Sequence, residues 1–404
     1  MTLDPFNAFL HREPQDGPGP TVGVKDVIDV SGMPTTAASR ILHRVPDRDA
    51  ECVARLRRVG AQIVGKLNTH EFAFGALTTS PHFGPSLNPW NTEHVCGGSS
   101  GGSGAAVAAG LVDIGVGTDT AGSVRIPAAF CGVTGIKPST GLVPTDGLIP
   151  TSWTLDTIGP LARTADECAW ALEVMAGRPI EVHEGDDLRI GVVESLFERA
   201  DPRVAVACEE ALRELGGRQE PVEIPLHEEI TTILQLVLLP EATAAHLQWL
   251  RTRLADYGAD VRARLLAGLF LPSTAYVTGQ RARRWAMSER ERALGRYDLL
   301  VAPAMPILPP RLDAIPEDYR LLLIPYNSPA SLWGAPAASI PCGLVDGLPV
   351  GLSMMGRNGE DGVVLGAARA FQRVTDWHER RPPLTVDVAE KNRIQDADQR
   401  LKGV

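Results

Sequence analysis

Residues 97–127 read GGSSGGSGAAVAAGLVDIGVGTDTAGSVRIP, and the rest of the chain is organised around this stretch. It holds two clusters of glycine and hydroxyl-bearing residues, 97–104 and 118–123, joined by the apolar run 105–116. Glycine-rich turns let the backbone approach a ligand closely and point several N–H groups at one spot. The serines in both turns indicate an acyl-transfer site, whereas the backbone alone is equally typical of a phosphate cradle.

The alternatives to acyl transfer fit the surrounding sequence poorly. A P-loop ends in Gly-Lys-Ser/Thr, and residues 101–104 contain no lysine. A dinucleotide fingerprint follows a strand, but only a loop precedes residue 97. Residues 97–101 match the nucleophile elbow G-x-S-x-G, which also needs a strand directly before it, and residues 91–96 lack a strand pattern. A tight turn without a chemical role stays open for the first cluster taken alone.

A catalytic serine needs a base, because its hydroxyl is a weak nucleophile. Ser123 ends the second cluster, where the N–H groups of residues 120–123 can converge as an oxyanion hole. No histidine lies nearby in the sequence, but Lys25 follows the short apolar strand 21–24. Only five of the chain's basic residues are lysines, and a buried lysine, unlike arginine, can lose its proton. Lys25 is therefore the candidate base, and a second serine would relay the proton.

At this point the chain resembles the amidase signature family, whose catalytic set is Ser–cis-Ser–Lys. The order and spacing of the motifs fit over residues 21–378, and together the motifs are highly specific. The matching segments are GVKDVID at 23–29, GGSSGGS at 97–103, GTDTAGSVRIP at 117–127, GVTGIKP at 132–138, LDTIGP at 155–160 and DGLPVG at 346–351.

The resemblance implies a role for each catalytic residue. Ser123 is the nucleophile, Lys25 is the base, and Ser99 is the bridging serine, with a cis peptide bond from Gly98. The backbone amides of the second turn form the oxyanion hole, namely those of Thr120, Ala121, Gly122 and Ser123. Residues that support the site are Gly98, Ser100, Asp119 and Arg125.

Two points on the site stay open. Arg125 braces the site in the favoured interpretation, and binding a substrate carboxylate is the alternative. Ala121 stands where family members often have a second glycine before the nucleophile, so it narrows the approach while keeping its N–H. For the substrate pocket we expect contributions from the loop 70–96 and the helical segment 227–297, with the side chains Phe74, Tyr326 and Trp333 as candidates.

The fold class predicted is α/β, with a single large mixed sheet flanked by helices on both faces. The β–α–β alternation of residues 21–24, 49–60 and 61–67 indicates such a sheet. Thr164 and Glu167 predict a capping box at the start of a helix. We expect an N-terminal surface arm at 1–20, a catalytic domain at 21–380 and a polar tail at 381–404. A helical insertion at 227–297, with breaks near Pro240, Gly258 and Pro272, shapes the substrate side.

The function expected from the resemblance is hydrolysis of a small-molecule carboxamide through a seryl acyl-enzyme, releasing ammonia or an amine. Two alternatives stay open: a glutamine-hydrolysing subunit of a tRNA-dependent amidotransferase, and an esterase or carbamate hydrolase on the same site. No cofactor and no metal are expected. The partner expected is a small-molecule amide, without nucleic acid or membrane, and a homodimer stays open.

The composition is that of an ordinary soluble enzyme. The 404 residues are 44% hydrophobic and 22% charged, with a net charge of -10, which argues against an anionic polymer or membrane surface as the main partner. No run of about 18 apolar residues is apparent. The six scattered cysteines are typical of reduced thiols, so we expect a cytoplasmic location.

Overall fold

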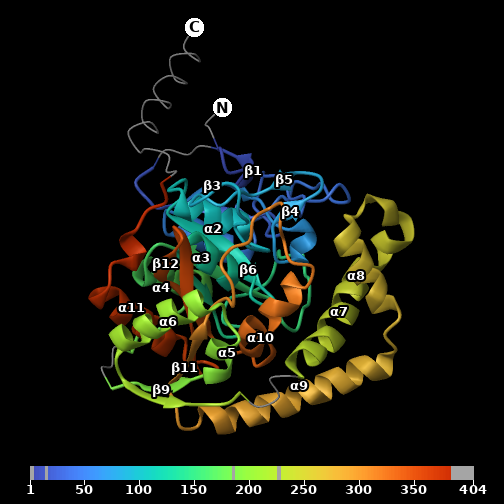
Figure 1. The fold of residues 1–404 in the computed structure, drawn as a ribbon. Helices are drawn as coiled ribbons and strands as arrows, with labels where there is room; N and C mark the ends of the chain where they lie inside the picture. Colours follow the sequence, from blue (N-terminus) through green and yellow to red (C-terminus); the bar gives the residue numbers. More distant parts are fainter. Residues whose placement is uncertain (1–3, 14–16, 184–186, 225–228, 384–404) are drawn as a thin grey trace.

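A mixed sheet of 11 strands forms the core of the computed structural model, which describes residues 4–13, 17–183, 187–224 and 229–383. The strand order is β1-β3-β2-β6-β8-β7-β12-β13-β11-β9-β10 (Figure 1). The predicted fold class is confirmed. The strands are β1 (Phe9–Arg12), β2 (Thr21–Lys25), β3 (Gln62–Leu67), β6 (Ile114–Asp119), β7 (Thr134–Lys137), β8 (Thr157–Ala162), β9 (Arg189–Val192), β10 (Arg218–Pro221), β11 (Leu299–Pro303), β12 (Ala337–Val345) and β13 (Leu348–Met355), with β4 (Thr79–Ser80) and β5 (Gly84–Pro85) as a separate pair.

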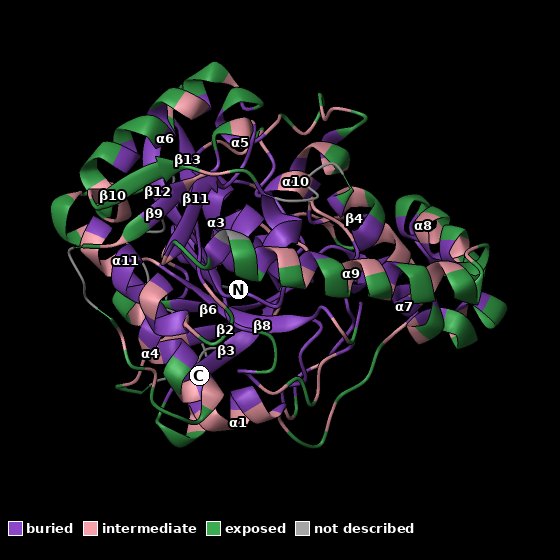
Figure 2. Ribbon diagram, turned by 90° about the horizontal axis from the view of Figure 1, so that it is seen from below, coloured by how far each residue is buried: buried purple, intermediate pink, exposed green. Residues whose placement is uncertain are grey.

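Helices cover both faces of this sheet. Figure 2 shows most of the strands buried between helices whose outer faces are exposed, whereas β10, at the edge of the sheet, is exposed. The helices are α1 (Glu51–Arg58), α2 (Gly101–Ala108), α3 (Arg125–Cys131), α4 (Ala165–Ala176), α5 (Glu194–Glu198), α6 (Pro202–Leu215), α7 (Ile230–Thr252), α8 (Ala259–Leu269), α9 (Ser273–Leu294), α10 (Tyr319–Leu332) and α11 (Asp361–Val374), with single 3₁₀ turns at η1 (Glu71–Ala73), η2 (Leu254–Asp256) and η3 (Trp377–Glu379).

The parallel part of the sheet brings the predicted catalytic segments to one edge. Strand β2 lies between β3 and β6 and runs parallel to both. Their carboxyl ends therefore point the same way, and in open α/β sheets ligands bind beyond those ends. Lys25 is the last residue of β2, and Asp119 is the last residue of β6. The sequence between them supplies α2, which is buried along its whole length.

Helix α2 fits beneath the site because its residues are small. A Cβ atom on Gly102 would lie 2.5 Å from the carbonyl oxygen of Asn68 and 2.6 Å from that of Ala8. Contacts that short do not occur, so any side chain there would push the helix away from the backbone below it. Glycine at position 102 thus allows α2 to pack closely against the backbone at Asn68 and Ala8.

Helix α4 begins and ends as its sequence predicts. The Thr164 hydroxyl accepts a hydrogen bond from the Glu167 N–H at 3.1 Å, and the Glu167 carboxylate accepts one from the Thr164 N–H at 2.9 Å. Gly177 follows in the left-handed conformation that only glycine adopts at low cost. The predicted capping box is confirmed.

Helices α7, α8 and α9 form a layer to one side of the sheet, seen in yellow and orange in Figure 1. The break predicted at Pro240 is wrong, because α7 continues through it. Its buried side chains, among them Leu234 and Leu238, hold the helix against α8, α9 and α10, and this packing outweighs the one missing N–H. By length and composition α7 could cross a membrane, but half of its apolar window is buried, as in the core helix of a soluble protein.

Other elements differ from the sequence prediction in position. Strands β1 and β8 and helix α10 were not predicted. Helix α10 contains Pro325 and Pro329, which obscure its helical pattern. Most of the predicted C-terminal tail, residues 384–404, lies outside the described residues.

Candidate active site

Lys25 is completely buried at the end of β2, with its ammonium nitrogen surrounded by hydroxyl groups. Its Nζ lies 2.7 Å from Ser99 Oγ, 2.9 Å from Ser100 Oγ and 2.7 Å from Thr118 Oγ1. Ser99 and Ser100 precede α2, 74 and 75 residues along the chain, and Thr118 lies in the adjacent strand β6. The structure therefore brings the predicted base and the predicted bridging serine into direct contact.

The surroundings of Lys25 favour a neutral amine. Burial lowers the pKa of Lys25 from 10.5 to about 7, although the negative charges of Asp119 and Asp156 act in the opposite direction. No carboxylate forms an ion pair with its Nζ in the described part of the chain. An amine with such a pKa is a proton acceptor near neutral pH.

The first glycine-serine turn is held rigidly in place. The peptide bond between Gly98 and Ser99 is cis, as the family resemblance implies. The Ser99 carbonyl accepts three hydrogen bonds, from the His70 N–H at 3.1 Å and from the hydroxyls of Thr69 and Thr78 at 3.0 and 3.1 Å. The first residue of the predicted loop 70–96, His70, thus helps to hold the predicted bridging serine in place.

Ser123 lies at the opening of the site. Its exposed fraction is 9%, against 0% for Ser99 and Lys25. The Ser100 N–H donates to the Ser123 carbonyl at 3.1 Å, which ties the two turns together. The Ser123 hydroxyl has no hydrogen-bond partner among the described residues, so it is free to meet a ligand. The hydrogen bond from a nucleophilic serine to its proton acceptor is often long in a free enzyme and shortens when substrate binds.

The predicted oxyanion turn differs from expectation at Gly122. The Gly122 N–H donates to Asp119 Oδ1 at 2.7 Å, so it is not available to a ligand. The N–H groups of Thr120, Ala121 and Ser123 have no partner within the described chain, which leaves these three as the donors. Gly122 instead provides the backbone shape: its φ is +118°, and a Cβ atom there would lie 2.7 Å from Asn327 Cβ.

Asp119 and Arg125 form a buried ion pair beneath this turn. The Arg125 guanidinium donates to both carboxylate oxygens of Asp119 at 3.0 Å and to the Asn327 carbonyl at 2.9 Å. Burial raises the pKa of Asp119, but the charge and hydrogen bonds of Arg125 outweigh it and lower the pKa to about 2. Arg125 is 1% exposed. These contacts support the bracing role of Arg125 and leave no room for the alternative, a substrate carboxylate.

Sequence reasoning missed two residues of this cluster. Thr118 lies within a family motif and received no role, yet its hydroxyl contacts Lys25. Asp156 lies in the LDTIGP motif and accepts hydrogen bonds from the Thr120 hydroxyl at 2.6 Å and from the backbone N–H groups of Thr151 and Ser152. Burial raises the pKa of Asp156 to about 6. Both residues lie inside family motifs, and this position was the feature of the sequence that could have identified them as part of the site.

A pocket opens directly onto Ser123. It is enclosed by the loop after η1, the oxyanion turn, and helices α3, α7, α8 and α10. The lining residues are Ala73, Phe74, Gly75, Ala76, Thr120, Ala121, Ser123, Ile126, Thr151, Leu234, Leu238, Arg264, Arg320, Leu323 and Ile324.

Of the three predicted pocket side chains, only Phe74 lines this space. Tyr326 is buried beside another cavity, and its hydroxyl donates to the Leu196 carbonyl at 2.9 Å. Trp333 is completely buried in the core at the end of α10. The prediction was wrong for both because successive residues of α10 face different sides, and Leu323 and Ile324 are the ones that reach the pocket.

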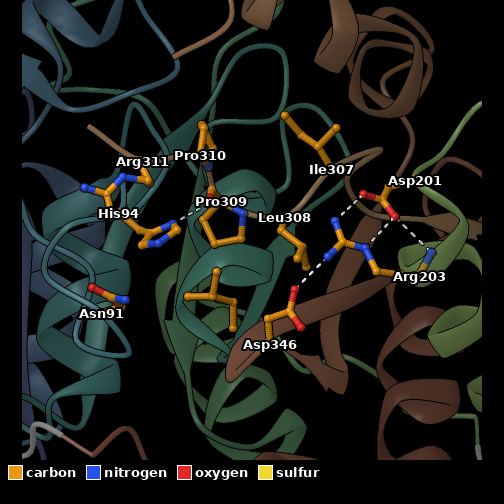
Figure 3. Close-up of a pocket in the computed structure, with 11 residues that line it drawn as sticks. Asn91, His94, Asp201, Arg203, Ile307, Leu308, Pro309, Pro310, Arg311 and Asp346 are labelled. Atoms are coloured by element: carbon orange, nitrogen blue, oxygen red, sulfur yellow. Dashed lines mark hydrogen bonds and ion pairs between the residues drawn. The ribbon is translucent and has the colours of Figure 1, made fainter. Parts of the chain in front are cut away.

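A second hollow lies on the surface and is lined by none of the catalytic candidates (Figure 3). Its charged groups are already paired: Arg203 bridges Asp201 at 2.7 Å and Asp346 at 2.6 Å, and His94 contacts the Pro309 carbonyl at 2.7 Å. Within the described ranges, no group of three or more His, Cys, Asp or Glu residues is arranged to hold a metal ion.

Comparison with known proteins identifies relatives along most of the chain. A model of the amidase family matches residues 18–365. A glutamyl-tRNA(Gln) amidotransferase subunit from Roseiflexus sp. (strain RS-1) is 37% identical over 91% of this chain and 85% of its own. The crystal structure of the corresponding Thermotoga maritima protein aligns with a TM-score of 0.84 and 35% identity, covering 96% of this chain and 92% of that one. A crystal structure of an amidase aligns with the same TM-score and identity, covering 88% and 85%.

These relatives overturn the predicted partners. The sequence led us to expect a small-molecule amide as the partner and no nucleic acid. The relatives are instead named as subunits of an amidotransferase for glutamyl-tRNA(Gln), which is an assembly concerned with a nucleic acid. The prediction rested on the acidic net charge, and the charge summed over one chain does not exclude a nucleic acid as a partner.

Proposed function

The chain belongs to the amidase family, and from this premise we propose that it is the amide-hydrolysing subunit of a tRNA-dependent amidotransferase, acting through an acyl-enzyme on Ser123. Hydrolysis of a carbon–nitrogen bond follows from the family. What we propose beyond the family is the catalytic triad of Lys25, Ser99 and Ser123 and the association with an amidotransferase partner. The observation that carries the triad is the buried contact of 2.7 Å between Lys25 Nζ and Ser99 Oγ.

The proposed reaction begins with proton transfer along the three residues. Neutral Lys25 accepts the Ser99 proton, and Ser99 accepts the proton of Ser123 as its Oγ attacks the amide carbonyl. The negative charge that develops on the carbonyl oxygen is stabilised by the free N–H groups of Thr120, Ala121 and Ser123.

The tetrahedral intermediate then breaks its carbon–nitrogen bond. Ser99 returns the proton to the leaving nitrogen, Lys25 restores the Ser99 proton, and ammonia departs. Water then attacks the acyl-enzyme, with Ser99 and Lys25 accepting its proton, and Ser123 regains a proton as the carboxylic acid is released. Each step needs Lys25 to gain and lose one proton near neutral pH, which a lysine in contact with hydroxyls alone can do.

The relatives support the assignment to an amidotransferase. In this role the released ammonia passes to a partner that amidates glutamyl-tRNA(Gln), and the protein works in the cytoplasm. The amide donor proposed for this role on family grounds is glutamine.

The two parts of the proposal can be tested separately. Ser123→Ala should abolish labelling by a fluorophosphonate probe, whereas Ser103→Ala should not, because Ser103 is a buried serine of α2 whose hydroxyl donates to the Val116 carbonyl. Labelling that survives in Ser123→Ala would exclude Ser123 as the nucleophile.

The amidotransferase role is tested on the complex purified from its native host. Ser123→Ala should block amidation of glutamyl-tRNA(Gln) from an amide donor yet leave amidation from added ammonium intact, since ammonium bypasses the hydrolytic site. Donor-dependent hydrolysis by the isolated chain at the full rate of the complex, without any tRNA amidation by the complex, would exclude this role.

A further inference from the structure

Glu241 is a buried carboxylate in the middle of α7 that takes no part in the proposed proton transfers. Its Oε2 accepts hydrogen bonds from the Ser152 hydroxyl at 2.5 Å and the Thr154 N–H at 3.2 Å. Its Oε1 accepts from the Tyr276 hydroxyl at 2.8 Å and from the Gln280 side-chain amide at 3.2 Å, both on α9. The Thr154 hydroxyl lies 2.9 and 3.1 Å from the two oxygens. Glu241 therefore joins α9 to the segment that leads into β8.

Arg283 of α9 holds the same segment at a second point. Its guanidinium donates to the Thr154 hydroxyl and to the Thr154 carbonyl, each at 2.9 Å, and to the Leu332 carbonyl at 2.9 Å. Burial lowers the pKa of Arg283, and the negative charge of Glu241 acts in the opposite direction. Thr154 is thus fixed by groups of opposite charge from two helices of the helical layer.

The segment held in this way carries Asp156, which contacts the oxyanion turn. Asp156 Oδ2 accepts hydrogen bonds from the N–H groups of Thr151 and Ser152 at 2.8 and 2.9 Å. Asp156 Oδ1 accepts from the Thr120 hydroxyl at 2.6 Å. All of these side chains are buried. The contacts therefore run without a break from Glu241 through Asp156 to Thr120, whose N–H is one of the three free donors of the oxyanion turn.

Resting on the function proposed for Ser123, we infer that Glu241 is a positioning residue for this reaction. It holds the segment 151–156 in the place from which Asp156 fixes Thr120, and so it keeps the Thr120 N–H directed at the carbonyl oxygen of the substrate. Glu241 is not among the described residues that line the pocket at Ser123, so it acts through this chain of contacts and not on the substrate.

The size of the effect follows from the demands of oxyanion stabilisation. Removal of one oxyanion donor typically slows a reaction by about 100- to 1,000-fold. A displacement of about 1 Å at a reacting centre costs about 100-fold. Loss of the Glu241 carboxylate leaves Asp156 and its hydrogen bonds in place but loosens the segment that carries them. We therefore expect a smaller effect than loss of a donor.

The second-order rate of fluorophosphonate labelling measures this effect on the purified full chain, with partner subunits if they co-purify. The phosphoryl oxygen of the probe takes the oxyanion position, so its rate responds to the direction of the Thr120 N–H. Glu241→Gln keeps the volume of the side chain but replaces one acceptor oxygen by an NH₂ group, and it should slow labelling by about tenfold. Ser152→Ala removes one hydroxyl of the same chain of contacts and should slow it by about three- to tenfold. If Glu241→Gln does not fold, Ser152→Ala carries the test.

Thr243→Val is the matched control, because Thr243 is also buried on α7. Its hydroxyl donates to the Leu265 carbonyl of α8 at 2.8 Å and belongs to no contact with the segment 151–156. The control therefore loses a buried hydrogen bond of the helical layer, and its labelling rate should stay within about twofold of the unmodified protein. An equal slowing in Thr243→Val, or a normal rate in both folded Glu241→Gln and folded Ser152→Ala, would overturn the inference.

A double-mutant cycle distinguishes positioning through Thr120 from general support of the fold. Thr120→Val breaks the contact with Asp156 and should by itself slow labelling by about tenfold. Adding Glu241→Gln to Thr120→Val should then slow it by less than about twofold more, because the chain of contacts is already broken. If the two effects multiply in full, Glu241 acts independently of Thr120 and the inference is wrong.

The two proposals fail in distinguishable ways. If Ser123 of the unmodified protein is labelled and the Glu241 and Ser152 variants react at the same rate, the positioning inference fails and the proposed function stands. If Ser123 of the unmodified protein is not labelled, the proposed mechanism fails at its first step, whatever the variants do.

Discussion

Lowering the pH should switch off acylation of Ser123 in proportion to the protonation of Lys25. With a pKa of about 7, the amine is about nine-tenths neutral at about pH 8, half neutral at about pH 7 and about one-hundredth neutral at about pH 5. At its ordinary pKa of 10.5 it would be neutral in only about three molecules in ten thousand at about pH 7. The rate should therefore fall about tenfold per pH unit on the acid side.

The second-order rate of fluorophosphonate labelling, followed between about pH 5 and pH 9, measures this without knowledge of the donor. Asp156 complicates the profile, because burial raises its pKa to about 6 and it titrates in the same range. The variant Asp156→Asn separates the two groups. It removes a negative charge that raises the pKa of Lys25, so the acid limb should persist and move to lower pH.

Two results would refute this reasoning. If the acid limb disappears in Asp156→Asn, the titrating group is Asp156. If Lys25→Arg labels at the normal rate, a residue that cannot lose its proton suffices, and proton abstraction by Lys25 is excluded. A folded state that is unchanged by circular dichroism is the control for each variant.

Three further predictions concern the residues around Ser123. Gly122→Ala should slow labelling at least about 100-fold while leaving the protein folded, because the new Cβ would meet Asn327 and the backbone φ of +118° disfavours any side chain. Arg125→Met should lower the free energy of unfolding in urea by about 3–5 kcal/mol, since it leaves the Asp119 carboxylate buried and unpaired; a loss below about 1 kcal/mol would contradict the bracing role. Tyr326→Phe should cost only about 1 kcal/mol of unfolding free energy and leave the labelling rate unchanged, because its ring lies outside the pocket; a slower rate would return Tyr326 to the site.

The part of the site that lies in turns could be predicted from the sequence. Glycine and serine at fixed spacing carry strong local constraints, and the motifs place Ser99, Ser123 and Lys25 in their roles by resemblance. The contact between Lys25 and Ser99 depends on β2 and β6 lying side by side in parallel, which periodicity alone does not determine. The resemblance supplied that long-range pairing.

The pocket walls could not be predicted in the same way. They come from α3, α7, α8 and α10, and what decides a contact there is the rotation of each helix about its axis. In α10, Leu323 and Ile324 line the pocket, whereas Tyr326, two residues further on, lies beside another cavity. Two prolines obscure the helical pattern from which the orientation of these residues would be predicted. For this reason Phe74, on the loop beside the catalytic turns, was found, whereas Arg264 and Arg320 were not.

The buried basic residues of this fold explain why Lys25 is suited to the proposed role of base. The three lysines among the described residues are all completely buried, but their partners differ. Lys66 faces the Asp26 carboxylate at 3.1 Å, a partner that favours the charged form, whereas Lys137 donates to two backbone carbonyls, which accept protons poorly and pass none on. Of these three, only Lys25 contacts hydroxyls that can exchange protons without a carboxylate facing its nitrogen. Arg125, by contrast, carries a permanent buried charge. Arginine suits that position because it stays protonated, whereas lysine suits position 25 because it can lose its proton.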